Sequence, residues 1–326
     1  MDSNQLTPPR LILGSTTTIW NVDISRYQAP SHQFYADPSL REFTYSLMAN
    51  TSLLKGLFFD VFGTVVEWRN CVASSLREAA ERALRDPKKT LSLALRARAT
   101  AMSSNDWQEL VEEWRASYGQ FTRKFDPSQT FISIDEHHFD SIQKLLHQYD
   151  LKGLFTEDEQ WELVFSWHRL EPWPDSVKGL ELLNRRFRTC TLSNGNISLL
   201  RDLQRHGSLP FTDIVSAQHF EAYKPSPQVY TGAAKRFGLD PCNCAMVAAH
   251  LYDLKAAKAL GFATIYVERN DENLTPQEIA QAKEQYVDEW VDGATDGLIE
   301  VARRLGIQEE PDLASTCSVG SDLDSV

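Results

Sequence analysis

The amino-acid sequence predicts an α/β fold, in which helices alternate with the strands of a parallel sheet and a helical segment is inserted after the first strand. Short apolar runs typical of buried parallel strands occur at Gly56–Phe59, Arg188–Leu192, Asp213–Ser216, Ala245–Ala248 and Ala263–Val267. Helical patterns separate the last four runs, which implies right-handed crossovers between parallel strands. Residues 67–171, between the first two runs, show helical periodicity instead.

Composition places the chain among soluble globular proteins. It has 326 residues, of which 42% are hydrophobic and 24% charged, and a formal net charge of −12. This charge disfavours general nucleic-acid binding, which needs clustered Lys and Arg. The five cysteines are odd in number and scattered, and Cys242-Asn243-Cys244 does not have zinc-site spacing. No apolar run has the length of a membrane span, and no signal-peptide pattern is visible, so we expect a cytoplasmic protein.

The first apolar run leads directly into Asp60, and Gly63 and Thr64 follow closely. Open α/β sheets bind their ligands at the carboxyl ends of the strands, where an aspartate without partners is costly to desolvate. Asp60 is therefore a candidate functional residue. The alternative is a turn or a helix N-cap.

Residues 67–171 contain apolar side chains at helical spacing. The clearest stripe consists of Trp107, Leu110, Val111, Trp114, Tyr118 and Phe121. Ser74–Leu84 and Ile142–Leu151 show further helical patterns. An insertion immediately after Asp60 is well placed to cover it. We therefore expect a helical cap domain at 67–171 and an α/β core at 53–66 and 172–308. An irregular arm is expected at 1–52 and a disordered acidic tail at 309–326.

Polar residues also follow the second and third runs. Ser193-Asn194-Gly195 ends the second, where hydroxyl and amide groups could serve a ligand or simply form a turn before the Ser198–His206 helix. Lys224 precedes Pro225 and Pro227 in the loop after the third. Prolines suit a helix entrance, so this loop is stiff, and Lys224 is a better candidate than an ordinary solvated lysine. Tyr230 lies on the helix that follows, predicted at Gln228–Phe237.

The fourth run leads into His250 and Asp253. Asp253 could instead cap a helix at Leu254–Leu260, and His250 could be a structural histidine.

Together and in this order, the four motifs resemble those of the haloacid dehalogenase superfamily, over residues 55–270. In that family the first strand lies centrally in a Rossmann-like sheet, between the strands that bear the second and fourth motifs. The resemblance implies that Asp60, Ser193, Lys224 and Asp253 meet at the switch point of the sheet, beneath the cap.

Most members of that superfamily are Mg²⁺-dependent phosphatases, which carry a second aspartate two residues after the nucleophile. Here that position is Phe62, which can neither donate nor accept a proton. The phosphatases also have an acidic metal ligand four or five residues before the position of Asp253, where this chain has Ala249 and Ala248. The sequence therefore resembles the metal-independent branch, the type II (S)-2-haloacid dehalogenases, which implies no cofactor and no metal.

The resemblance to that branch implies roles for individual residues. Asp60 would attack the carbon that bears the halogen and form an ester, and Arg115, which follows Trp114 as in the family, would take the halide with Asn194. Lys224 and Ser193 would hold the nucleophile and the substrate carboxylate. The remaining implied roles are water activation by Asp253, fixing of Lys224 by Tyr230, and pocket lining by Phe62, Trp114, His250 and Tyr252.

Three positions depart from well-known members, which have Ser at Ala248, Asn at His250 and Trp at Tyr252. Because these residues would line the base of the pocket, the departures leave open which substrate size and charge the pocket accepts. The resemblance implies hydrolysis of short 2-haloalkanoic acids to 2-hydroxy acids, with a small anionic haloacid and halide as partners and a possible homodimer. The alternatives are hydrolysis of another small acid or ester, a phosphatase, and a non-enzymatic anion-binding protein.

Overall fold

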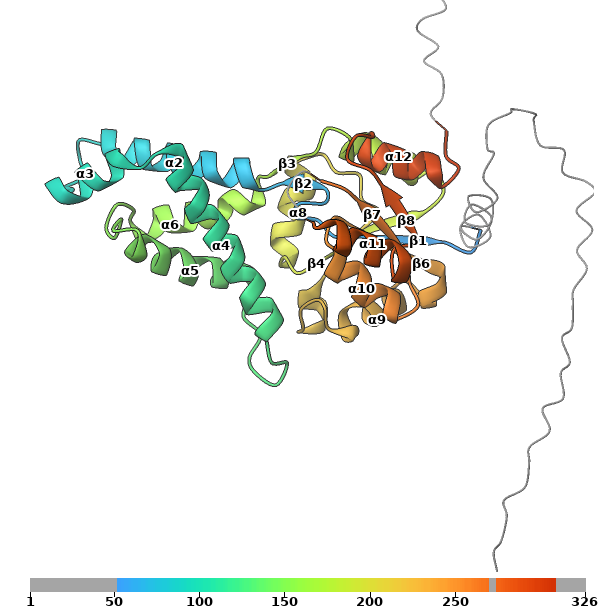
Figure 1. Ribbon diagram of the computed structural model, residues 1–326. Coiled ribbons are helices and arrows are strands. Elements are labelled where there is room, and N and C mark those ends of the chain that lie inside the picture. The colour runs from blue at the N-terminus through green and yellow to red at the C-terminus, as the bar shows by residue number, and fades with distance from the viewer. Residues whose placement is uncertain (1–51, 270–273, 309–326) are drawn as a thin grey trace, which may run out of the picture. The chain divides into compact units, whose positions relative to one another are not determined.

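The structure of the protein is a computed structural model that describes residues 52–269 and 274–308, all within one compact unit, Thr44–Val326 (Figure 1). The predicted arm, apart from its last residue, and the predicted acidic tail lie outside the described residues. No helix in the described ranges is both long and apolar enough to cross a membrane.

The core is a six-stranded parallel sheet in the order β5-β4-β1-β6-β7-β8. Its strands are β1 (Gly56–Phe59), β4 (Arg188–Ser193), β5 (Asp213–Ser216), β6 (Cys244–Ala248), β7 (Ala263–Val267) and β8 (Glu289–Val291). Strand β1 lies between β4 and β6, as the resemblance implied. The predicted α/β fold with an inserted helical cap is therefore confirmed.

Helices cover both faces of this sheet, because successive side chains of a strand point to opposite faces. Leu57 and Phe59 of β1 pack in one apolar cluster with α7 (Ser176–Leu183), α8 (Ile197–His206) and α12 (Gly297–Arg304). Phe58 packs in the other cluster with α9 (Pro227–Arg236), α10 (Leu251–Ala259) and α11 (Pro276–Gln285). Single-turn 3₁₀ helices lie at Ala217–Phe220 (η2) and Pro241–Asn243 (η3).

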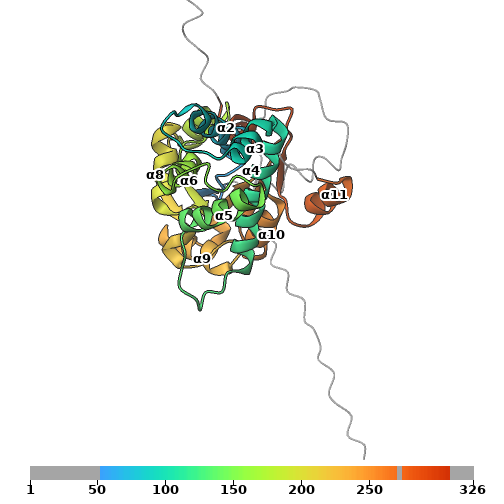
Figure 2. The same ribbon diagram turned by 90° about the vertical axis from the view of Figure 1, so that its left-hand side faces the viewer.

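The inserted segment is helical and forms the cap. It consists of α2 (Arg69–Arg85), α3 (Leu93–Ala101), α4 (Ser104–Lys124), α5 (Ile134–Gln148), α6 (Glu157–Val164) and the 3₁₀ helix η1 (Phe165–His168). Capping boxes begin α4 at Ser103, α5 at Ser133 and α6 at Thr156. A short antiparallel pair, β2 (Val66–Glu67) with β3 (Glu171–Pro172), joins the two chain segments that connect cap and core. Figure 2 views the molecule from the cap side.

Most element boundaries agree with the sequence, and the differences have local causes. Helix α5 begins at Ile134 rather than Ile142, because Ser133 and Glu136 form its capping box while the first turn is polar and hides the periodicity. It ends before Asp150, whose φ of 57° is left-handed and stops the helix. Strand β8 was not predicted, because three residues with a half-buried start make no apolar run.

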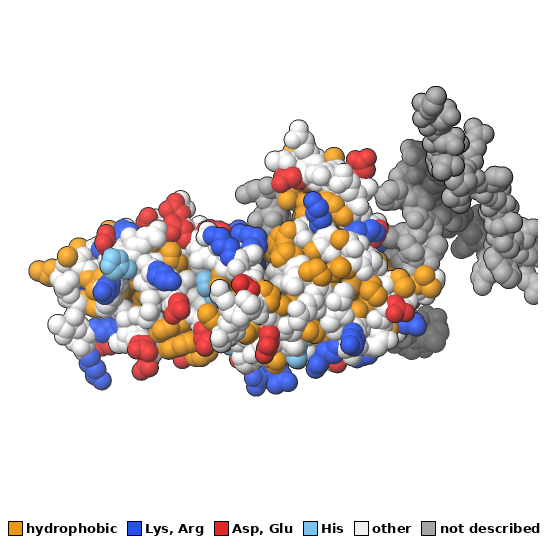
Figure 3. Space-filling model, turned by 90° about the horizontal axis from the view of Figure 1, so that it is seen from below, with side chains coloured by type: hydrophobic (Ala, Val, Ile, Leu, Met, Phe, Trp, Pro, Cys, Tyr) orange, Lys and Arg blue, Asp and Glu red, His pale blue; other side chains and the backbone are white. Residues whose placement is uncertain are grey.

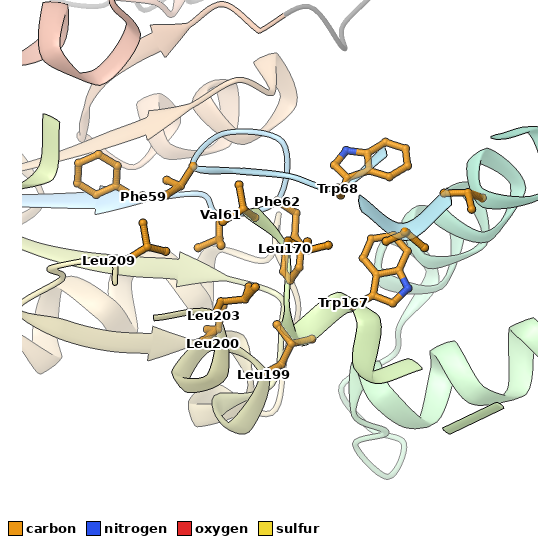
Figure 4. Close-up of a cluster of buried hydrophobic side chains, with 14 of the residues drawn as sticks. Phe59, Val61, Phe62, Trp68, Trp167, Leu170, Leu199, Leu200, Leu203 and Leu209 are labelled. Atoms are coloured by element: carbon orange, nitrogen blue, oxygen red, sulfur yellow. The ribbon is translucent and has the colours of Figure 1, made fainter. Parts of the chain in front are cut away.

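Cap and core share one continuous apolar cluster (Figure 4). Trp167 of η1 stands at the junction, stacked on Trp68 with ring centroids 6.0 Å apart and edge-on to Phe62 at 6.3 Å. Leu199 and Leu203 of α8 belong to the same cluster. The cap is therefore packed onto the core next to the carboxyl end of β1, where Asp60 lies. The exact domain boundaries at residues 66/67 and 171/172 stay predictions.

Candidate active site

Asp60 follows β1 directly and is 6% exposed. Its backbone amide donates to Val247 O at 3.0 Å, so the side chain is aimed by the central pairing of the sheet. Oδ1 accepts from Lys224 Nζ at 2.9 Å, and Oδ2 accepts from His250 Nδ1 at 2.8 Å and from Thr64 Oγ1 at 3.0 Å. Because a carboxylate only accepts, the Nδ1 atom of His250 carries the proton in this contact.

Lys224 lies in the loop between η2 and α9 and is 2% exposed. Its Nζ atom contacts Asp60 Oδ1 and also forms an ion pair with Asp253 Oδ2. Asn194 holds the backbone of this loop: its Oδ1 accepts from Lys224 N at 2.7 Å, and its Nδ2 donates to Lys224 O at 3.3 Å. The amide of Asn194 thus positions Lys224, a role that sequence alone did not suggest.

Asp253 lies in the first turn of α10 and is fully buried. Tyr230, on α9, donates its hydroxyl to Asp253 Oδ1 at 2.5 Å. Tyr230 therefore holds the aspartate directly and reaches Lys224 only through it. Ser193, at the end of β4, is also buried, and its Oγ accepts from Gly195 N at 3.3 Å. The structure brings together all four strand-end motifs.

The charges of this cluster stabilise one another. Burial alone would raise the pKa of Asp60, but Lys224 and His250 outweigh it and the pKa is strongly lowered. Burial raises the pKa of Asp253, and the negative Asp60 adds to this, so the net shift is upward despite Lys224. Burial would lower the pKa of Lys224, but the two aspartates raise it. Asp60 is therefore an ionised carboxylate, as a nucleophile must be.

Arg115 of α4 is the cation that faces this cluster from the cap. Its guanidinium carbon lies 4.5 Å from the ring centroid of Tyr118, 5.7 Å from that of Trp68 and 6.0 Å from that of Phe62. Among the described ion pairs, none joins Arg115 to a carboxylate. Burial lowers its pKa, but Tyr118, Tyr252 and Asp60 outweigh that effect and raise it. A charged guanidinium in an aromatic surround without a carboxylate is suited to binding an anion.

A cavity of about 300 Å³ opens beside Arg115 and His250, the hydrogen-bond partner of Asp60. Its lining includes Gly63, Trp68, Arg115, Tyr118, His250 and Tyr252. Tyr252 is 47% exposed and stands at the solvent side of the cavity. A larger hollow of about 850 Å³ lies on the cap around α5 and contains none of the predicted site residues.

Two predicted pocket residues lie elsewhere than in the cavity wall. Trp114 is fully buried inside the cap, where its Nε1 donates to His138 O at 3.1 Å and to Ser141 Oγ at 3.0 Å. It faces the cap interior because Arg115, the next residue on the helix, takes the face toward the core. Phe62 lies beneath Arg115 and packs against Gly195, where an added Cβ would meet its ring at 3.0 Å.

Sequence reasoning missed three residues of the site. Thr64 bridges Asp60 and the loop after β6, since its Oγ1 also accepts from Ala249 N at 2.9 Å. Trp68 and Tyr118 form the aromatic surround of Arg115. Tyr118 could have been found, because it lies one turn after Arg115 on the same helix face.

Fold and side chains together define a class of protein: an α/β protein with a parallel sheet, whose helical cap packs over a buried, ionised carboxylate at the carboxyl end of the central strand. Among the described residues, no group of three or more His, Cys, Asp or Glu side chains is arranged to hold a metal ion.

The chain belongs to the haloacid dehalogenase-like hydrolases, whose family pattern matches residues 54–261. It is 27% identical over 235 residues to (S)-2-haloacid dehalogenase 4A of Burkholderia cepacia, covering 71% of this chain and 90% of that protein. It is 32% identical over 145 residues to (S)-2-haloacid dehalogenase 1 of Pseudomonas sp. (strain CBS-3), covering 44% of this chain and 59% of that protein.

The solved structures that this chain resembles include dehalogenases of the same family. A defluorinating L-2-haloacid dehalogenase is 29% identical with a TM-score of 0.65, and the match covers 78% of this chain and 95% of that one. Another L-2-haloacid dehalogenase is 31% identical with a TM-score of 0.63, over 77% of this chain and 99% of that one. The predicted resemblance is therefore confirmed.

Proposed function

We propose that this protein hydrolyses short 2-haloacids to 2-hydroxy acids through an ester on Asp60. One observation carries the proposal: a buried carboxylate is kept ionised by Lys224 and His250, faces the unpaired cation Arg115, and has Phe62 where a phosphatase needs an acid. A departing halide needs no proton, so this reaction does not require an acidic residue at position 62. The named activities of the similar dehalogenases support the same reaction.

In the first step a carboxylate oxygen of Asp60 bonds to C2 of the substrate as the carbon–halogen bond breaks. The halide leaves with the bonding electron pair and is received by Arg115. Asp60 is 6% exposed, so few water molecules have to be removed from its carboxylate before it attacks. In this proposal Lys224 and Ser193 supply the cation and the hydroxyl donor for the carboxylate of the substrate.

In the second step a water molecule adds to the Cγ atom of Asp60 and gives a proton to Asp253. The ester bond between Cγ and the former Asp60 oxygen then breaks, and the leaving alkoxide takes the proton back from Asp253. The 2-hydroxy acid keeps the original aspartate oxygen, and Asp60 keeps the oxygen of water and releases a proton to solvent. The raised pKa of Asp253 suits it to accept this proton.

The first experiment is halide release from the two enantiomers of 2-chloropropanoate and from 2-fluoropropanoate, with EDTA present. We expect turnover with at least one chloro acid in EDTA, and a loss of at least about a thousandfold in Asp60→Ala. The exposed Asp158→Ala on α6 is the matched control and should retain full activity. Multiple turnover in H₂¹⁸O should place ¹⁸O in the peptide that contains Asp60.

Halide release that requires Mg²⁺, or none from any 2-haloacid, would contradict this function. A cytoplasmic location and a homodimer stay predictions alongside it.

A further inference from the structure

Beyond the reacting centre, the cavity wall carries an excess of positive charge. Four arginines, Arg69, Arg115, Arg123 and Arg269, line it together with one acidic residue, Glu112. This excess is local, because the whole chain has a formal net charge of −12. On the face in Figure 3, basic and acidic side chains are interspersed.

Two of these arginines form ion pairs with carboxylates of the protein. Arg69 forms an ion pair with Glu112. Arg269 binds Asp175 through both terminal nitrogens, at 2.7 and 2.8 Å, and its Nε donates to Thr64 O at 3.1 Å. They therefore hold the walls together and offer little to a ligand.

Arg115 and Arg123 are different, since no ion pair among the described residues joins either of them to a carboxylate. Both lie on α4, and a separation of eight residues places them on the same side of the helix, about two turns apart. Arg115 is inside the cavity, and Arg123 is exposed at its mouth.

Gly119, midway between the two arginines, brings their charges closer. The guanidinium of Arg123 lies over this glycine, where an added Cβ would meet Nη1 at 3.1 Å and Nη2 at 3.5 Å. The charge of Arg123 is thereby moved back along the helix to the level of Gly119, about 6 Å from the level of Arg115 along the axis. A Cβ at residue 119 would push this guanidinium outward by a few tenths of an ångström and remove its close seat on the helix.

The room in the cavity fits an extended substrate. At about 30 Å³ per water molecule in the liquid, a cavity of about 300 Å³ has space for roughly ten waters, more than a three-carbon acid fills. A haloacid held at C2 by Asp60 and Arg115 would direct the rest of its chain toward the mouth. In a four- or five-carbon diacid the second carboxyl carbon lies about 2.5–4 Å from C2, and this length together with the reach of an arginine hydrogen bond spans the distance.

We propose that the cavity selects 2-halodicarboxylic acids of four or five carbons, with Arg123, folded over Gly119, binding the second carboxylate. This substrate class rests on the proposed dehalogenase function and specifies its cavity. Arg123 would act as a specificity residue and take no part in the bond changes at C2.

The test compares kcat/KM for 2-chlorosuccinate and 2-chlorobutanoate, which have the same carbon chain length. We expect the wild type to prefer the diacid by about tenfold or more, the size of one charge-assisted hydrogen bond at an accessible site. Arg123→Gln should reduce the ratio of the two values toward one. Lys124→Gln, a neighbouring exposed cation on α4 that does not line the cavity, is the matched control and should leave the ratio unchanged.

Gly119→Ala provides a second variant, which keeps the arginine but pushes its guanidinium outward from the helix. Alanine favours the helix, so this protein should fold at least as well, yet its diacid preference should fall. High salt should weaken the preference of the wild type, because the charge of Arg123 is exposed to solvent.

A binding measurement separates this proposal from the dehalogenase function. Succinate and butanoate carry no halogen, and calorimetric titration should show succinate binding about tenfold more tightly to the wild type and equally weakly to Arg123→Gln. Absence of halide release with this binding pattern intact would refute the dehalogenase and leave the diacid site standing. Equal kcat/KM and equal binding for diacid and monoacid in the wild type, or loss of preference in Lys124→Gln, would overturn the diacid site.

Discussion

At the scale of single residues, the site contains two carboxylates that share one ammonium group but have opposite pKa shifts. Lys224 contacts Asp60 and Asp253, but their environments differ, because Asp60 has two further hydrogen-bond donors and Asp253 is more deeply buried. The pKa of Asp60 is lowered and that of Asp253 is raised. Opposite shifts of two neighbouring acids suit one for attack on carbon and the other for accepting a proton from water.

Asp253→Asn should therefore stop the second step and spare the first. An amide cannot take the proton of the attacking water, but Asp60 remains ionised beside Lys224. We expect less than about 1% of wild-type turnover with 2-chloropropanoate, and a stable adduct on the peptide that contains Asp60 in intact-protein and peptide mass spectrometry. Recovery of unmodified Asp60 peptide after a single equivalent of halide release would contradict the role of Asp253.

The same residues predict how activity depends on pH. Water activation needs ionised Asp253, so turnover should fall as pH drops through a pKa above the usual aspartate value of 3.8. Ester formation needs ionised Asp60, whose pKa is lowered, so a rapid first release of halide should persist at a pH where steady-state turnover is already lost. Rapid-quench measurement of halide across the acid range distinguishes the two steps. Parallel loss of both phases would contradict this assignment.

Much of this site could be predicted from the sequence, because its position depends on topology. Asp60, Ser193, Lys224 and Asp253 each follow an apolar strand, and the carboxyl ends of parallel strands meet at one edge of a sheet. The directions of individual side chains could not be predicted. The ring of His250 faces Asp60, an orientation that depends on the backbone of one loop residue and has no signature in sequence spacing.

At the scale of elements, a buried histidine connects the cap to the core. His168 of η1 lies between Asp135 of α5, 3.1 Å from Nε2, and Asp202 of α8, 2.8 Å from Nδ1. Asn196 adds a second link by donating to Asp135 Oδ2 at 2.7 Å. Burial lowers the pKa of His168, but the two aspartates outweigh it and the net shift is upward. The cations near this contact are Arg205, paired with Asp202, and Arg169, paired with Glu162.

His168 should stabilise the folded protein in a defined pH range. A histidine with a raised pKa contributes its full stabilisation below the unfolded-state value of 6.5 and loses it as pH rises through the folded-state pKa. Asp202, whose pKa is lowered, limits the range on the acid side. We expect His168→Gln to lower the free energy of unfolding by about 1–3 kcal/mol near pH 6 and by clearly less near pH 9.

Urea denaturation at the two pH values measures this difference. The control for a general effect of histidine removal is His206→Gln, at an exposed histidine of α8 that contacts Glu171. A destabilisation by His168→Gln that is the same at both pH values would show that the residue contributes packing alone.

At the scale of the whole molecule, the described cap and core form one packing unit. The sheet could be predicted from the sequence, because apolar runs identify its strands. The packing of the cap onto the core could not be predicted. The rings of Trp68 and Phe62, which Trp167 contacts in space, are about a hundred residues away from it along the chain. Contacts of such long sequence separation leave no local periodicity.

Cap and core should consequently unfold together. Trp167→Ala removes a fully buried side chain whose Nε1 has no hydrogen-bond partner, so the loss is one of packing. We expect a cost of about 3–5 kcal/mol and a single transition that coincides in far- and near-ultraviolet circular dichroism. Phe187→Leu, in the core away from the junction, serves as a comparison. Two separated transitions in the wild type would contradict a shared cluster.

The ion pairs of Lys224 also protect the protein from alkylation by its own substrate. A 2-haloacid is an alkylating agent, because free amines and thiolates attack its C2 carbon in the same way that Asp60 does in the proposed reaction. Held between two carboxylates with its pKa raised, the Lys224 amine has no free electron pair to offer. Burial likewise raises the pKa of the Cys71 thiol to about 11 and that of the Cys244 thiol to about 12. These three groups therefore stay protonated, so none of them competes with Asp60 for the reactive carbon.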